Sequence, residues 1–298
     1  MPLSTILRAA ASLLALIVTC GTLAGTPASS VQDEFDAASA AAQAARVDGP
    51  NRLALRDQAA LDLPAGFSYI PVAQAARLMH AIGNPTDDGF MGLVVGEAMN
   101  GFVSIRHEKS GHVRDDDARD WNPGELLNNL REGAEAGNEE RRQRGIPEFV
   151  VGGWVEAPAY DATTHRLVWS AEIRDKAPGD GDASPGVNYN TYQLGRDGYI
   201  SMNLVTNLDG VDSQKPLARL LLDGLSFNEG KRYADFNADT DSVAPYGLAA
   251  LVGGIAAKKL GLLATAGLFL AKFWKIAAIA AVGFGVGLKR LFSRKTDA

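Results

Sequence analysis

The chain of 298 residues contains a single cysteine, Cys20, which lies near the N-terminus. A domain built from the other residues therefore has no internal disulfide, no thiol nucleophile and no thiolate zinc site. The sequence also lacks the Gly-x-x-x-x-Gly-Lys-Ser/Thr loop, the Gly-x-Ser-x-Gly elbow and the Rossmann-type glycine fingerprint. These absences exclude thiol catalysis and remove the usual signatures of nucleotide binding and of serine acyl transfer.

Acidic residues are missing from the stretch between Tyr246 and Phe292. Eight basic residues and one acidic residue follow position 245, which gives this end a charge of +7. Because the whole chain carries −6, the preceding part carries −13. Nucleic-acid phosphates require a basic face, so the acidic part is not expected to bind nucleic acid.

The N-terminus has the pattern of a secretory signal peptide, which we assign to residues 1–28. Arg8 precedes the apolar stretch Ala9–Val18, and small residues suited to cleavage follow. This stretch is too short to cross a bilayer, as expected of a signal peptide. A second interpretation remains open, in which the sequence before Cys20 is a lipoprotein box and the thiol is lipidated.

The C-terminal end predicts a membrane anchor, with a transmembrane helix over residues 273–292. Its core, Ile276–Leu288, contains only apolar residues and glycine. Trp274 and Lys275 suit one membrane interface, and Lys289 and Arg290 suit the other. Gly283 and Gly287 form a small-residue pair of the kind found where helices associate in membranes.

The flanks of this helix indicate its orientation. The basic tail, residues 293–298, is expected in the cytoplasm by the positive-inside rule, which agrees with export of the middle of the chain. Residues 246–272 are predicted to form a membrane-proximal helix that is apolar and basic. Three alternatives remain open for it: a re-entrant piece, the start of one long tilted span, or a helix packed on the exported domain. The predicted location is the cytoplasmic (inner) membrane, with one span and the main domain outside.

Between these ends we expect a stalk and a domain. Residues 29–62 are rich in alanine and polar residues and have few large apolar side chains, so they are assigned to a stalk. The domain is assigned to residues 63–245.

Three hairpins and two helices dominate the predicted domain. Asn100-Gly101 and Asp197-Gly198 are strong hairpin turns, and Asn122-Pro123 is a typical helix start. The predicted hairpins join residues 90–98 to 102–109, 149–156 to 166–174, and 187–194 to 199–206, with a small final hairpin over 225–227 and 231–236. The predicted helices cover residues 71–82, 122–144 and, for a short one, 216–223. Hairpins without strand–helix–strand periodicity favour an α+β fold with a mainly antiparallel sheet and a few packed helices.

Several motifs resemble the bacterial family called domain of unknown function 2167, a family of predicted membrane-anchored proteins. The densest block is Gly111-His112-Val113, Asp115-Asp116-Asp117-Ala118, Trp121 and Glu125-Leu126-Leu127. Further matches are Gly153-Trp154, Tyr160-Asp161, Leu167, Trp169, Leu194-Gly195-Arg196, Asn203-Leu204-Val205, Tyr233, Asp235-Phe236, Ala244 and Tyr246-Gly247-Leu248. The resemblance implies an envelope location and membrane attachment, and it supplies no catalytic residues.

Two polar clusters are candidate sites. His112, Asp115, Asp116 and Asp117 offer an imidazole and carboxylates, which could hold a divalent metal. The alternative is a surface loop whose aspartates lie near a helix N-terminus. Gly111, Trp121, Asp235, Asp239 and Asp241 mark a second candidate functional loop. The segment from Asp235 resembles the start of a calcium loop but has Thr240 and Tyr246 at its diagnostic positions.

Together these patterns favour a non-enzymatic envelope protein whose exported acidic domain binds a partner or has a structural role. No cofactor is predicted. Membrane lipids are the expected partners of the C-terminal anchor, and an envelope protein is a candidate partner of the domain. The alternative function is a metal-dependent hydrolase that uses His112 and Asp115–Asp117.

Overall fold

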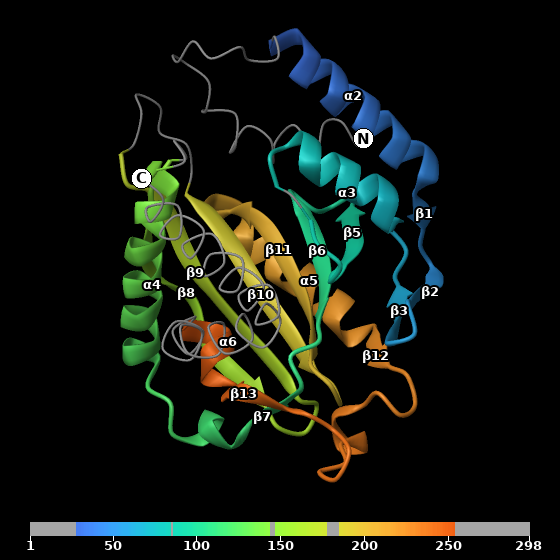
Figure 1. The fold of residues 1–298 in the computed structure, drawn as a ribbon. Coiled ribbons are helices and arrows are strands. Elements are labelled where there is room, and N and C mark those ends of the chain that lie inside the picture. The colour runs from blue at the N-terminus through green and yellow to red at the C-terminus, as the bar shows by residue number, and fades with distance from the viewer. Residues whose placement is uncertain (1–27, 85, 144–146, 178–184, 254–298) are drawn as a thin grey trace, which may run out of the picture. The chain divides into compact units, whose positions relative to one another are not determined.

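An eight-stranded antiparallel sheet runs through the structure, with strand order β1-β4-β5-β6-β11-β10-β9-β8 (Figure 1). The structure is a computed structural model that describes residues 28–253 except 85, 144–146 and 178–184. A three-stranded sheet, β12-β3-β2, and a parallel pair, β13-β7, complete the strands of the described residues. The large antiparallel sheet and the several helices confirm the predicted α+β class.

The strands are β1 (Val47–Asp48), β2 (Asn51–Leu55), β3 (Ala59–Leu63), β4 (Phe67–Ile70), β5 (Phe90–Gly96), β6 (Phe102–Glu108), β7 (His112–Arg114), β8 (Phe149–Asp161), β9 (Arg166–Asp175), β10 (Gly186–Leu194), β11 (Tyr199–Asn207), β12 (Leu225–Phe227) and β13 (Val243–Gly247). The α-helices are α2 (Ala28–Ala45), α3 (Val72–Ala81), α4 (Pro123–Gln143), α5 (Val211–Asp223) and α6 (Ala249–Gly253). Short 3₁₀ helices are η1 (Asp116–Arg119), η2 (Leu208–Gly210) and η3 (Tyr233–Asp235).

The large sheet buries apolar side chains on both faces. Successive side chains of a strand point to opposite faces. On β11, Ile200, Met202 and Leu204 enter a core shared with α5, β2, β3 and β12. Tyr199 and Val205 lie on the other face, where one core is formed with α2 and α3 and another with α4, α6, β7 and β13. Burial on both faces explains why β5, FMGLVVG, has no polar residue and is buried along its whole length.

The assignment of residues 29–62 to a stalk is wrong. Leu55 and Leu61 are buried in the main core, and β2 and β3 form two strands of the smaller sheet. Helix α2 packs against α3 through Phe35, Ala38 and Ala42, since small side chains allow two helices to approach closely. The sequence suggested a stalk because its apolar residues are small or few, and the partners that bury them lie far along the chain.

The predicted hairpins joining residues 90–98 to 102–109, 149–156 to 166–174 and 187–194 to 199–206 are confirmed by β5–β6, β8–β9 and β10–β11. The tight turn of the first precedes Asn100-Gly101, since the Met99 amide donates to the Gly96 carbonyl oxygen at 3.1 Å. Helices α3 and α4 begin within one residue of prediction, and the Asn122 Oδ1 accepts hydrogen bonds from the amides of Gly124 (2.8 Å) and Glu125 (3.3 Å). The helix predicted over 216–223 begins earlier, at Val211.

The final hairpin predicted over residues 225–236 is wrong. β12 pairs with β3, far away in the sequence, and Tyr233–Asp235 forms a 3₁₀ turn instead of a strand. A strand as short as Leu225–Phe227 can be stabilised by any free sheet edge, and the edge of β3 lies beside it.

The C-terminal boundary of the domain also differs from the prediction. β13 extends to Gly247 and pairs with β7, and Leu248 and Val252 are buried beside Val113. Tyr246–Gly253 is therefore part of the domain rather than of a membrane-proximal helix.

The predicted signal peptide lies outside the described residues except for Ala28, the first residue of α2, and the predicted transmembrane helix lies wholly outside them. Outside them as well are Cys20, residues 254–272 and the anchor residues Trp274, Lys275, Gly283, Gly287, Lys289 and Arg290. Within the part of the chain that the structure describes, no helix has the length and apolar character needed to cross a membrane.

Candidate functional site

The block from Gly111 to Trp121 lies where several distant segments of the domain meet. It contacts the turn between β8 and β9, the loop around η3, β13 and the start of α6. Many residues that carry the family resemblance come from these same segments, so the fold gathers them at one end of the large sheet.

Gly111 permits the close pairing of β7 with β13. Its φ is +87°, which favours glycine, and a Cβ there would lie 2.9 Å from the carbonyl oxygen of Ser242 and 3.0 Å from the amide of Ala244. The next amide, that of His112, donates to the Ser242 carbonyl oxygen at 2.8 Å. Gly111 is thus a structural residue of the site.

The His112 imidazole is enclosed by aromatic rings. It stacks on Phe236 with a centroid distance of 4.0 Å and on Tyr233 at 4.3 Å. The ring is buried, and its Nδ1 has no hydrogen-bond partner. Burial lowers the pKa of His112, outweighing the nearby carboxylate of Asp115. This environment favours the neutral ring, which acts as part of the packed core.

Asp115, Tyr160 and His165 form a hydrogen-bonded network. The Tyr160 hydroxyl donates to Oδ2 of Asp115 at 2.6 Å and lies 3.1 Å from Nδ1 of His165. Because the tyrosine proton is directed to the carboxylate, the contact with His165 requires a proton on Nδ1. The His165 ring also stacks on Tyr233 at 4.0 Å, which links this network to His112.

This network holds Asp115 as a carboxylate and Tyr160 as a phenol. Burial opposes ionisation of Asp115, but the Tyr160 and Tyr233 hydroxyls and His165 outweigh it, so the pKa of Asp115 lies below its ordinary value. Burial and the adjacent carboxylate raise the pKa of Tyr160. The pair can therefore accept and donate hydrogen bonds, whereas Tyr160 is not suited to act as a base at neutral pH.

Asp117 is directed away from the other predicted metal ligands. Its Oδ1 accepts from the Leu248 amide and its Oδ2 from the Ala249 amide, both at 3.0 Å. The carboxylate therefore binds the start of α6, where the Leu248 amide also donates to the carbonyl oxygen of Arg114 at 3.1 Å. Asp116, between these two aspartates, is exposed to solvent.

The second predicted loop folds around Asp241. Its carboxylate accepts two hydrogen bonds from Arg196, one from Nε at 2.7 Å and one from Nη2 at 2.9 Å. It also accepts from the backbone amide of Asn237 at 2.8 Å. The bond with the Arg196 guanidinium is the main cause of a strongly lowered pKa of Asp241. Asp235 accepts from the Arg232 amide at 2.9 Å, and Asp239 is exposed.

The structure brings His112 and Asp115 into one region but does not assemble the four predicted metal ligands around a common point. Among the described residues, no group of three or more His, Cys, Asp or Glu side chains is placed to hold a metal ion. Asp115 faces Tyr160 and Asp117 faces α6. Asp235 and Asp241 direct their carboxylates to backbone amides and Arg196, whereas Asp239 is exposed.

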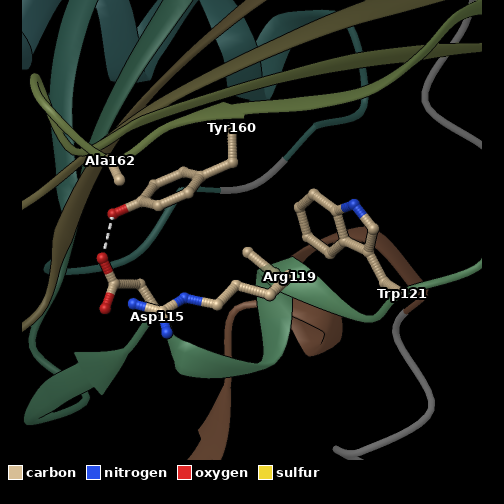
Figure 2. A pocket seen from close by; sticks show the side chains of 6 residues that line it. Asp115, Arg119, Trp121, Tyr160 and Ala162 are labelled. Atoms are coloured by element: carbon tan, nitrogen blue, oxygen red, sulfur yellow. Dashed lines mark hydrogen bonds between the residues drawn. The ribbon is translucent and has the colours of Figure 1, made fainter.

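A pocket opens on the solvent side of this network. It is lined by Asp115, Ala118, Arg119, Trp121, Tyr160 and Ala162, has a volume of about 220 Å³, and is called the Asp115 pocket below (Figure 2). Tyr160 comes from the end of β8, whereas Arg119 and Trp121 come from η1 and the segment after it. Figure 2 shows Arg119 extending between Trp121 and Asp115.

Arg119 differs from most arginines of the domain. Arg106, Arg166 and Arg196 each form an ion pair with an aspartate. Arg119 is exposed and makes no hydrogen bond or ion pair with another residue that the structure describes. Its guanidinium is available to a ligand of the pocket.

The sequence interpretation identified Asp115 and Trp121 but missed Arg119, Tyr160 and His165 as parts of this site. Of these three residues, only Tyr160 belongs to the motifs of the family resemblance. In the structure His165 has a φ of +54°, and its ring lies 4.0 Å from that of Tyr233.

Comparisons with known proteins identify the family. No curated protein matches the chain. The solution structure of cyanobacterial PsbP (CyanoP) from Synechocystis sp. PCC 6803 is similar at 12% sequence identity and a TM-score of 0.36, covering 71% of this chain and 99% of that chain. This similarity is too low to define a shared fold. The family described as protein of unknown function DUF2167 matches residues 47–283, most of the sequence, and the chain belongs to that family.

Proposed function

We propose that this protein is attached to the cytoplasmic membrane by its C-terminal segment and that its exported acidic domain binds an envelope partner in the Asp115 pocket. The two ends of the sequence support the location. An apolar stretch follows Arg8, and an apolar stretch flanked by basic residues ends the chain. The basic cluster Lys289, Arg290, Arg294 and Lys295 at the end of the chain suits a tail inside.

The observation that carries the binding role is the contrast between occupied and free side chains at the site. The carboxylates of Asp117 and Asp241 are bonded within the domain, and His112 is enclosed by rings. Arg119 has no partner among the described residues, and Trp121 lines the pocket beside it. A pocket with a few convergent polar groups and aromatic walls is the usual form of a binding site.

Topology can be tested with reporter fusions. A fusion after Pro245 would interrupt β13, so the fusion point is placed after Gly253, with a second fusion after Ala298. We expect the first reporter to be active only outside the cytoplasm and the second only inside. A cytoplasmic signal after Gly253 would contradict the proposed location.

The anchor can be tested by carbonate extraction. Ala281→Arg places a charge in the predicted span, which costs about 2.5–3.5 kcal/mol on insertion scales. We expect this variant to appear partly in the soluble fraction. Replacing Lys258 and Lys259 by glutamate should leave the span intact, because both residues precede it.

The binding role can be tested by retention on separated envelope fractions of protein, peptidoglycan and lipid. We expect the purified full chain to bind one of these fractions and Arg119→Ala and Trp121→Ala to weaken that binding. Arg114→Ala is a matched control, since Arg114 is also exposed but does not line the pocket. Equal retention of all four proteins would contradict a role of the Asp115 pocket.

A further inference from the structure

The lining of the Asp115 pocket combines two kinds of side chain that suit one class of ligand. We infer that the pocket binds a single uncharged saccharide ring of an envelope glycan, an inference that rests on the proposed binding function and names its ligand.

Trp121 and Tyr160 supply aromatic surface, and Asp115 and Arg119 supply planar polar groups. A pyranose ring has C–H groups that pack on an aromatic face and hydroxyls that both donate and accept hydrogen bonds. A carboxylate accepts from several donors at once, and Tyr160 uses only part of the capacity of Asp115. The Arg119 guanidinium offers several donors in one plane and is free to meet hydroxyl oxygens.

The charges of the lining favour a neutral ligand. The pKa of Asp115 lies below its ordinary value, so this residue is a carboxylate at neutral pH and opposes an anion in the pocket. The exposed residues Asp116, Asp120 and Asp161 flank the lining residues in the sequence and add negative charge. A cation would instead lie beside the Arg119 guanidinium. The lining itself, with one carboxylate and one guanidinium, has no net charge, and the surrounding aspartates oppose an anion.

The size of the pocket limits how much of a ligand it holds. Its volume of about 220 Å³ is below the roughly 300–1,000 Å³ that encloses drug-sized ligands. It corresponds to about seven water molecules at roughly 30 Å³ each, which is enough for one sugar ring. Two lining residues, Ala118 and Ala162, have only methyl side chains, so the remainder of an oligosaccharide can extend into solvent.

Saturation-transfer NMR on the purified full chain tests this inference, in a detergent without a sugar headgroup. The probes are chitotetraose and maltotetraose, which are neutral, with tetragalacturonate as an anionic probe and tetralysine as a cationic probe. We expect signal transfer to at least one neutral probe and at least tenfold weaker binding in Arg119→Ala and Trp121→Ala. Arg114→Ala should bind like the wild type, and Trp121→Phe, which keeps an aromatic face, should retain most of the binding.

Three outcomes would overturn the inference: no transfer to either neutral probe, transfer only to the charged probes, or neutral binding that survives both pocket substitutions in folded protein. Folding of each variant is checked by its thermal unfolding curve. Pocket-dependent retention on the protein or lipid fraction would also refute the saccharide while leaving the proposed binding function intact. The reporter fusions measure the location of the domain independently of these NMR binding experiments.

Discussion

The Asp117 carboxylate occupies the space that a side chain at position 247 would need. A Cβ on Gly247 would lie 2.3 Å from Oδ2 and 2.8 Å from Cγ of Asp117. The same carboxylate is held by the amides of Leu248 and Ala249. Glycine at 247 and aspartate at 117 are therefore matched, and together they join the family block to the last described helix.

Replacing Gly247 by alanine should destabilise the domain. The carboxylate must move to admit the methyl group, which breaks hydrogen bonds between a charged acceptor and two amides. We expect a loss of about 1–3 kcal/mol in the free energy of unfolding, measured by urea titration. A double-mutant cycle with Asp117→Ala should be strongly non-additive, because both changes disrupt the same contact.

Gly133→Ala is the matched control for this prediction. Gly133 lies within α4, and a Cβ there would meet nothing within 4 Å. Alanine should stabilise this helix position by about 0.4–1 kcal/mol, since it reduces the freedom of the unfolded chain. If the two alanine variants change the free energy of unfolding equally, the close contact with Asp117 is not the reason that position 247 requires glycine.

Asp241→Asn should reduce the dependence of stability on pH under acidic conditions. The pKa of Asp241 is lowered in the folded state, chiefly by Arg196, so the carboxylate stabilises the fold above its ordinary pKa of about 3.9. This stabilisation is lost as the pH falls from there through the lower folded pKa. The difference in free energy of unfolding between wild type and variant should therefore be largest above pH about 5 and shrink below pH about 4.

Urea unfolding at a series of pH values measures this difference. Asp239→Asn is the control, because Asp239 is exposed in the same loop. A difference between wild type and Asp241→Asn that stays constant down to the lowest pH would refute the role given to the ion pair.

His112→Phe should weaken the destabilisation that accompanies mild acidification. Burial lowers the pKa of His112, so the folded state binds fewer protons than the unfolded state as the pH falls below about 6.5. Wild-type stability should decrease over this range, and a phenylalanine that keeps the stack on Phe236 removes that contribution. Unfolding at pH 7.5 and pH 5.5 should therefore show a smaller change in the variant than in the wild type.

Leu61→Ala tests whether residues 51–63 belong to the core. Leu61 is fully buried in the main core, and truncation of such a leucine costs about 2–5 kcal/mol. Its neighbour Asp62 is exposed and pairs with Arg52 on the surface, so Asp62→Ala should cost no more than about 1 kcal/mol. If the two substitutions cost the same free energy of unfolding, residues 51–63 would behave as a stalk and not as buried strands.

Local signals in the sequence predicted the parts of the fold that depend on neighbouring residues. Asn100-Gly101 and Asp197-Gly198 lie in the loops of their hairpins, but the pairs Val94–Val103 and Leu194–Tyr199 show that both loops are longer than a two-residue turn. The Asn122 cap defines the start of α4, because its side chain accepts from the first amides of the helix. Nothing local indicates that β12 pairs with β3 or that β13 pairs with β7, since these pairings are set by burial elsewhere in the chain.

The candidate site was predictable only in part. The block around His112 and Asp115 was visible as a dense polar cluster, but its chemistry depends on Tyr160, which lies 45 residues from Asp115 in the sequence. Carboxylates close together in sequence suggested a metal, whereas the fold directs them to different partners. The free state of Arg119 follows from its position in η1 and cannot be derived from residue types alone.

The pairing of β3 with β12 has a consequence for synthesis. The strands β2 and β3 are among the first parts of the described chain to be translated, and β12 is among the last. The growing chain must therefore carry Leu53, Leu55 and Leu61 without their final neighbours Leu225 and Phe227 until most of the domain has been made. An early apolar surface of this kind is a natural target for a chaperone that keeps the chain unfolded.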